Sequence, residues 1–254
     1  MNSTEPRGAS FLRTRGTGNR LVLFICAISL AGFVHGGALS GGQAGGELQQ
    51  KLVALKQSAA ENQQRLHRYQ WTETAQMTLN DDAKPPTQSL CRYGPDGKVE
   101  KMPIGPPPDP PSGGRLKQRV VEKKKEEMKD YMGQVKNLLS MYVPPDPARM
   151  QQAFQAGKAS LSGAAGSGAA DVVFKDYALP GDQMTITFNT ATKTISSLNV
   201  QTYMDDPKDA VTLAAQFARL PDGTNYVQQS ILGATAKKLQ VTTTSSNYQP
   251  TPGQ

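Results

Sequence analysis

The chain has few of the side chains on which catalysis and metal binding depend. Its 254 residues include 2 Cys, 2 His and 1 Trp, and only 19% of them are charged. Zinc sites and Cys–His catalytic pairs require several thiolates and imidazoles at defined spacings. Serine-elbow, phosphate-loop and dinucleotide-binding motifs are missing as well. We therefore predict no catalytic residue, no metal site and no cofactor, and a protein that is not an enzyme.

Long apolar runs are also scarce, and the one candidate lies near the N-terminus. Residues 1–20 carry four Arg and one Glu, an apolar run of 14 residues follows at 21–34, and small residues come next. This order predicts a secretory signal peptide at 1–36, with cleavage after Gly36 or after Ser40. The alternative is an uncleaved membrane anchor at 21–34, although a bilayer-spanning helix needs about 20 residues.

Export would leave a mature domain with little excess charge and a single thiol. Cys26 lies inside the apolar run behind Phe24 and Ile25, which are too large to precede a lipid-modified Cys. We expect Cys26 to be removed with the signal, so that Cys91 remains alone and no intramolecular disulfide forms. The four Arg and one Glu at 1–20 account for +3 of the formal charge of +7. The charge that remains on the mature chain is too small to predict a nucleic-acid partner. No segment other than 21–34 approaches the length needed to span a membrane.

The mature chain is predicted to form a Gly-rich flexible leader at 37–46 and a single α+β domain at 47–250. Apolar residues at helical spacing predict helices, and Asp146 followed by Pro147 is a typical helix start. Alternation with a period of two, bounded by turn residues, predicts short antiparallel strands. A Pro-rich loop at 104–114 and a small-residue loop at 159–170 interrupt the pattern. The predicted helices are 47–66, 115–142 and 149–158, and the nine predicted strands are 69–79, 89–93, 98–102, 172–177, 184–189, 195–204, 211–219, 226–232 and 238–248.

The strands are predicted to share one apolar face. In 69–79 that face holds Tyr69, Trp71, Ala75, Met77 and Leu79. A large sheet with one apolar side must be covered, and the helices are the available cover. The predicted fold is a large, strongly curved antiparallel sheet, similar to a half-barrel and covered by about three helices.

The order of elements resembles the LolA/LolB/RseB-like superfamily of periplasmic lipoprotein carriers. A leading helix is followed by strands that begin with YQWTETAQM, then by a helical interruption and a long meander. The resemblance implies a half-open barrel whose concave apolar face is covered by helices and binds acyl chains. The chain differs in having nine predicted strands where that fold has about eleven, and a Pro-rich loop and a long charged helix without counterparts. The resemblance transfers no ligand-binding residue.

The residues themselves indicate where a ligand would lie. Apolar side chains on the concave face would meet flexible Met side chains on the long helix, which suits an acyl chain. We therefore predict an exported, non-catalytic protein of the periplasm or cell envelope that binds a lipid or lipidated peptide. The alternative is a structural or interaction scaffold of the envelope, in which the same residues fill a solid core and the partner is another protein. The predicted ligand-binding residues are Trp71, Met77, Met128, Met132, Phe188, Val200, Leu213 and Phe217.

Overall fold

The computed structural model describes residue 57 and residues 60–105, 115–162, 168–192 and 194–251. The predicted signal peptide, its cleavage sites and the predicted leader lie outside these residues. So do most of the first predicted helix and most of the Pro-rich loop.

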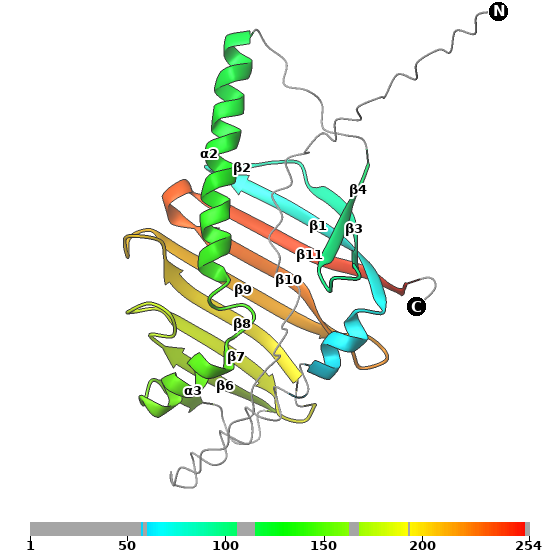
Figure 1. Cartoon of the computed structure of the whole chain (residues 1–254), viewed down its shortest axis with the longest axis vertical. Helices are drawn as coiled ribbons and strands as arrows, with labels where there is room; N and C mark the ends of the chain where they lie inside the picture. The colour runs from blue at the N-terminus through cyan, green and yellow to red at the C-terminus, as the bar shows by residue number, and fades with distance from the viewer. Residues whose placement is uncertain (1–56, 58–59, 106–114, 163–167, 193, 252–254) are drawn as a thin grey trace, which may run out of the picture.

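The alternating segments pair into one antiparallel sheet of eleven strands (Figure 1). Their order in the sheet is β4-β3-β1-β11-β10-β9-β8-β7-β6-β5, with β2 beside β1. The sheet is open and curved, with β4 and β5 at its edges, so the predicted α+β fold class is confirmed. The strands are β1 (Tyr69–Leu79), β2 (Asp82–Ala83), β3 (Thr87–Tyr93), β4 (Val99–Ile104), β5 (Ala159–Ser162), β6 (Ala169–Lys175), β7 (Gln183–Asn189), β8 (Thr194–Tyr203), β9 (Ala210–Arg219), β10 (Asn225–Ala234) and β11 (Leu239–Pro250).

The first and last strands lie side by side in the middle of the sheet. β1 pairs with β11 from Tyr69–Pro250 to Leu79–Leu239, with one irregularity opposite Trp71. This pairing joins the N-terminal strands to the meander from β5 to β11. One continuous face therefore runs across both parts of the chain.

Helices α2 (Arg115–Leu139) and α3 (Pro147–Gln155) connect β4 to β5. Both contribute side chains to the core that the sheet buries on one side, which we call the inner face. The Asp146 carboxylate accepts a hydrogen bond from the Ala148 N–H at 2.8 Å, and Pro147 occupies the first turn of α3. The predicted helix start is therefore confirmed. A short helical segment at 60–66 precedes β1, and the 3₁₀ turn η1 (Thr235–Lys237) precedes β11.

Several sequence-based boundaries were wrong, among them those of the helix predicted at 149–158, which is Pro147–Gln155 in the structure. The described residues form eleven strands, not nine, because β2 and β5 were missed. The predicted small-residue loop at 159–170 contains β5 and the start of β6, and Ile104 at the predicted loop boundary belongs to β4. The long helix ends at Leu139 rather than at Tyr142, where a turn follows. Small residues such as those of β5 have weak strand preference, and β5 forms because β6 supplies hydrogen-bonding partners at the sheet edge.

Candidate functional site

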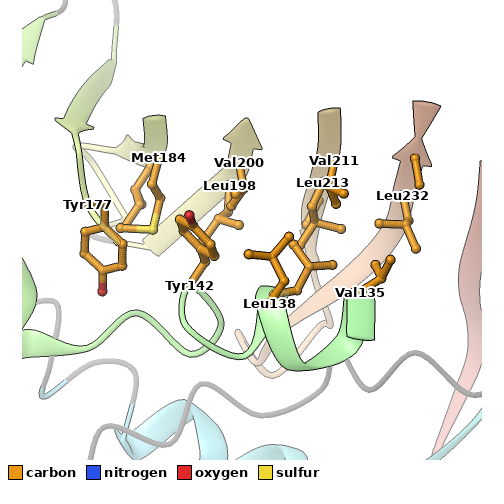
Figure 2. Packing of buried hydrophobic residues seen from close by; sticks show 14 of the residues in the cluster. Val135, Leu138, Tyr142, Tyr177, Met184, Leu198, Val200, Val211, Leu213 and Leu232 are labelled. Carbon is orange, nitrogen blue, oxygen red and sulfur yellow. The ribbon is translucent and has the colours of Figure 1, made fainter. Parts of the chain in front are cut away.

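The inner face carries a row of large apolar side chains that crosses the strands beneath α2. The register places these residues opposite one another in neighbouring strands. In Figure 2, Val135 of α2 lies opposite Leu232, and Leu138 lies opposite Leu213. Val135 is 0% exposed and Leu213 is 1% exposed, so this part of the interface is a filled core. The row consists of Phe174, Met184, Val200, Leu213, Leu232, Val241 and Met77.

A buried polar network fastens the end of α2 to the sheet. The Tyr142 hydroxyl donates to Asp182 Oδ2 at 2.5 Å and lies 2.7 Å from Thr202 Oγ1. Tyr177 donates its backbone N–H to the same carboxylate at 2.5 Å, and its hydroxyl accepts the Asp146 N–H at 2.6 Å. Burial raises the pKa of Tyr177 to about 12, and burial together with Asp182 raises the pKa of Tyr142. Both phenols therefore stay neutral, and the network is structural.

The next row on the inner face contains small side chains where it crosses β9, β10, β11 and β1. Ala215 pairs with Ser230, Ser230 with Thr243, and Thr243 with Ala75. Ala215 and Ser230 are 1% and 3% exposed. One row further from α2, large apolar side chains return but are only half-buried. They include Phe188 of β7, Phe217 of β9 and Val227 of β10.

A second apolar group lies on the same face at the far end of β1. Trp71, Cys91, Tyr93 and Val99 are buried together, and Leu66 of the helical segment 60–66 packs against them. Trp71 and Met77 are an even number of positions apart along β1, so both side chains point to the inner face. The structure separates them into two clusters, because the side chains between them on β1 are Ala75 and Glu73.

Aromatic rings surround Trp71. Tyr93 lies 5.5 Å from it, and Tyr248 stacks on it at 5.5 Å with an interplanar angle of 9°. His67 stacks on Tyr93 at 4.2 Å, and Tyr226 lies 4.4 Å from Tyr248. We call these five residues the aromatic cluster. Desolvation lowers the pKa of His67.

A buried ion pair lies next to the aromatic cluster. Lys101 of β4 donates to Glu73 of β1, and their side chains are only 7% and 11% exposed. Both residues point to the inner face, on either side of Cys91 of β3. Burial raises the pKa of Cys91 to about 12. The thiol is therefore protonated at neutral pH and is a poor nucleophile.

The eight residues predicted from the sequence all lie on the inner face or on the part of α2 above it, but in different surroundings. Val200, Leu213 and Met132 belong to the filled core, with exposures of 1%, 1% and 4%. Met77, Met128, Phe188 and Phe217 are half-buried at its margin. Trp71 lies apart in the second cluster. Whether these residues bind a ligand stays a prediction.

Sequence reasoning missed the polar residues of this face. Glu73 interrupts the apolar alternation between Trp71 and Ala75, and that interruption was the available signal. Its partner Lys101 belongs to β4. β4 lies near Glu73 only because β1 pairs with β3 and β3 pairs with β4. Within the described ranges, no group of three or more His, Cys, Asp or Glu could hold a metal ion. None of the helices described there is long and apolar enough to cross a membrane.

The sequence matches no protein-family model and no curated protein. Several solved structures align with this chain at low structural similarity, and two of them have informative descriptions. A DUF1329 family protein from Desulfovibrio piger aligns over 84% of this chain and 94% of its own, with 9% identity and a TM-score of 0.37. An outer membrane lipoprotein-sorting protein domain from Vibrio parahaemolyticus aligns over 81% and 94%, with 8% identity and a TM-score of 0.34.

Proposed function

We propose that this protein is an exported, non-catalytic component of the cell envelope that binds an acyl chain on the inner face of its sheet. The observation that supports this is the group of half-buried apolar side chains beside the filled core: Met77, Met128, Phe188, Phe217 and Val227. Large apolar side chains that are only partly covered are typical of a site for an apolar ligand. The exported location rests on the predicted signal peptide.

The proposed path of the chain follows the row of small side chains. Ala215, Ser230, Thr243 and Ala75 lie in register across β9, β10, β11 and β1. Leu213 and Leu232 stand on the α2 side of this row, and Phe217 stands on the other side. The side chains of this row are shorter than those of the rows on either side. Met77 and Met128 at the margin adapt to a flexible chain.

The first test is mass spectrometry of the organic extract from the exported protein, purified from cell envelopes without detergent. We expect a lipid or acylated molecule at about one equivalent. The variant Phe217→Glu, which puts a carboxylate on the proposed path, should lose that molecule while keeping its circular dichroism spectrum. Val120→Glu makes the same change at a residue that is 56% exposed on α2, and it should keep the molecule. A clean extract from the folded wild-type protein would contradict the proposal.

The single Trp provides a second test in solution. Trp71 lies on the inner face, so a brominated fatty acid bound there should quench its fluorescence. Unbrominated stearate of the same length should reverse the quenching by competition. Quenching that is linear in the concentration of the brominated acid and insensitive to stearate would indicate collision only, and would speak against a binding site.

The alternative function, a structural or interaction scaffold of the envelope, is favoured by the filled core beneath α2. Val135, Val200 and Leu213 are at most 1% exposed. Pairing of a strand from another protein with either sheet edge is disfavoured. The edge strand β4 carries Pro103 and the inward-pointing Lys101, and the edge strand β5 is only 4 residues long. Such features protect edges from added strands. A clean extract together with a stable envelope protein complex would support this alternative.

A further inference from the structure

Among the described residues, four buried side-chain polar atoms have no hydrogen-bond partner. Three of them, Arg65 Nε, Trp71 Nε1 and Thr251 Oγ1, belong to one junction. The fourth, the Tyr131 hydroxyl, belongs to α2 beside Lys237. Buried polar groups are nearly always paired in folded proteins. A concentration of unpaired groups at one place therefore needs an explanation.

The junction is where the helical segment 60–66 meets the start of β1 and the end of β11. The Thr251 N–H donates to the Arg68 carbonyl at 2.8 Å. Leu66 packs on the cluster that contains Trp71. Asn62 fixes the segment to the turn between β9 and β10 through two hydrogen bonds of 2.6 Å with the backbone of Asn225. These contacts bring together the segments that carry Arg65, Trp71 and Thr251.

The unpaired groups share one chemistry. The Arg65 guanidinium and the Trp71 indole N–H can only donate, and the Thr251 hydroxyl can donate as well. Burial raises the pKa of the nearby Asp222 carboxyl, but hydrogen bonds from Thr224 and Tyr69 and, least of all, the charge of Arg65 lower it below its ordinary value. Asp222 accepts from the Tyr69 hydroxyl at 2.7 Å and from the Thr224 N–H at 2.9 Å. Arg65 Nε, Trp71 Nε1 and Thr251 Oγ1 therefore remain as donors that lack an acceptor.

We infer that this junction binds the anionic oxygen group of an amphiphilic ligand, with Arg65, Trp71 and Thr251 as its donors. The inference rests on the proposed function and names the ligand class: an acyl chain with a carboxylate or phosphate head. Arg binds such oxyanions through charge-assisted hydrogen bonds. The acyl chain then runs from the aromatic cluster along the row of small side chains, and the head group lies at the junction.

The test is isothermal titration calorimetry on the delipidated exported protein with oleate and with oleyl alcohol, which has the same chain but no charge. We expect oleate to bind about tenfold more tightly. Arg65→Gln should remove most of that preference and leave the affinity for oleyl alcohol within about twofold, and Trp71→Phe should also lower the preference for oleate over oleyl alcohol. Arg65→Lys, which keeps the charge but not the Nε donor, should restore part of it. Oleyl phosphate distinguishes a phosphate site from a carboxylate site.

The matched control is Arg92→Gln, which removes one positive charge from a half-exposed Arg on the opposite face of β3. It should bind oleate as the wild-type protein does. Equal affinity of the wild-type protein for oleate and oleyl alcohol would overturn the inference and leave the proposed function standing. If the protein bound neither oleate nor oleyl alcohol, both the inference and the proposed function would be overturned. A loss of oleate preference in Arg92→Gln as large as in Arg65→Gln would also overturn it, because bulk charge would then explain the preference.

Discussion

The hydroxyl of Tyr142, just past the end of α2, donates a hydrogen bond to the carboxylate of Asp182, in the turn before β7, across 2.5 Å. Asp182 is 2% exposed, and its Oδ2 also accepts the backbone N–H groups of Ala178 at 2.9 Å and Leu179 at 2.6 Å. One carboxylate thus closes the turn between β6 and β7 and holds the helices against the inner face. Removing it exposes several donors at once.

We expect Asp182→Ala to lower the free energy of unfolding by about 3–5 kcal/mol, since several buried donors lose their charged acceptor. Tyr142→Phe should cost only about 1–2 kcal/mol, because the carboxylate keeps its backbone donors. Urea unfolding followed by circular dichroism measures both values. Equal losses for the two variants would show that the phenol, and not the carboxylate, organises the turn.

The ion pair between Lys101 and Glu73 leads to a second prediction about stability. Lys101→Met leaves Glu73 without its partner inside the protein and should cost about 3–5 kcal/mol. The double variant Lys101→Met with Glu73→Leu removes both charges and should recover most of that loss, since well-packed apolar residues often replace buried pairs without penalty. Chemical denaturation of both single variants and the double variant checks this. Additive losses would mean that the two side chains do not act as a pair.

The lowered pKa of His67 predicts a pH dependence of stability. The folded state resists protonation of the ring because it is partly desolvated, whereas the unfolded chain protonates near the ordinary value of 6.5. The unfolded state then binds more protons, so the contribution of His67 is present above pH 6.5 and is lost as the pH falls through the lower folded value. In thermal melts between pH 5 and pH 8, the melting temperature of the wild-type protein should fall more steeply toward low pH than that of His67→Phe. Parallel curves would exclude His67 as the cause.

Cys91 should be unreactive in the folded protein. Its side chain is 0% exposed, so a reagent cannot reach the sulfur. Its pKa is raised to about 12, so the reactive thiolate is scarce at pH 8. Iodoacetamide should label Cys91 only after addition of denaturant, as read by peptide mass spectrometry. Rapid labelling under native conditions would show that β1, β3 and β4 open on the timescale of the reaction.

Local patterns predicted the elements whose signals lie within a few residues. The alternation in YQWTETAQMTL marked the bounds of β1, Tyr69–Leu79, because successive strand residues face opposite sides of the sheet. Asp146 and Pro147 marked the start of α3, because a cap needs only its own turn. Strands β6 to β11 were found within a few residues of their ends for the same reason.

Elements that depend on a neighbour were not predictable in this way. β2 (Asp82–Ala83) has only two residues, and β5 has small residues apart from Leu161. Both are strands only because β1 and β6 supply hydrogen-bonding partners. The candidate site depends on residues that lie still further apart in the sequence. Sequence placed Trp71 with Met77 on one face, and that was correct, but Glu73 and Ala75 lie between them and separate the two clusters.

The sequence by itself determined the antiparallel α+β class, the apolar side of each strand and the scarcity of catalytic side chains, since these follow from composition and from periods of two and 3.6 residues. Only the tertiary structure decided that β1 pairs with β11, that Lys101 reaches Glu73, and that Arg65, Trp71 and Thr251 meet at one junction. Strand pairing over more than a hundred residues is chosen by the burial of whole faces. No local pattern records that choice.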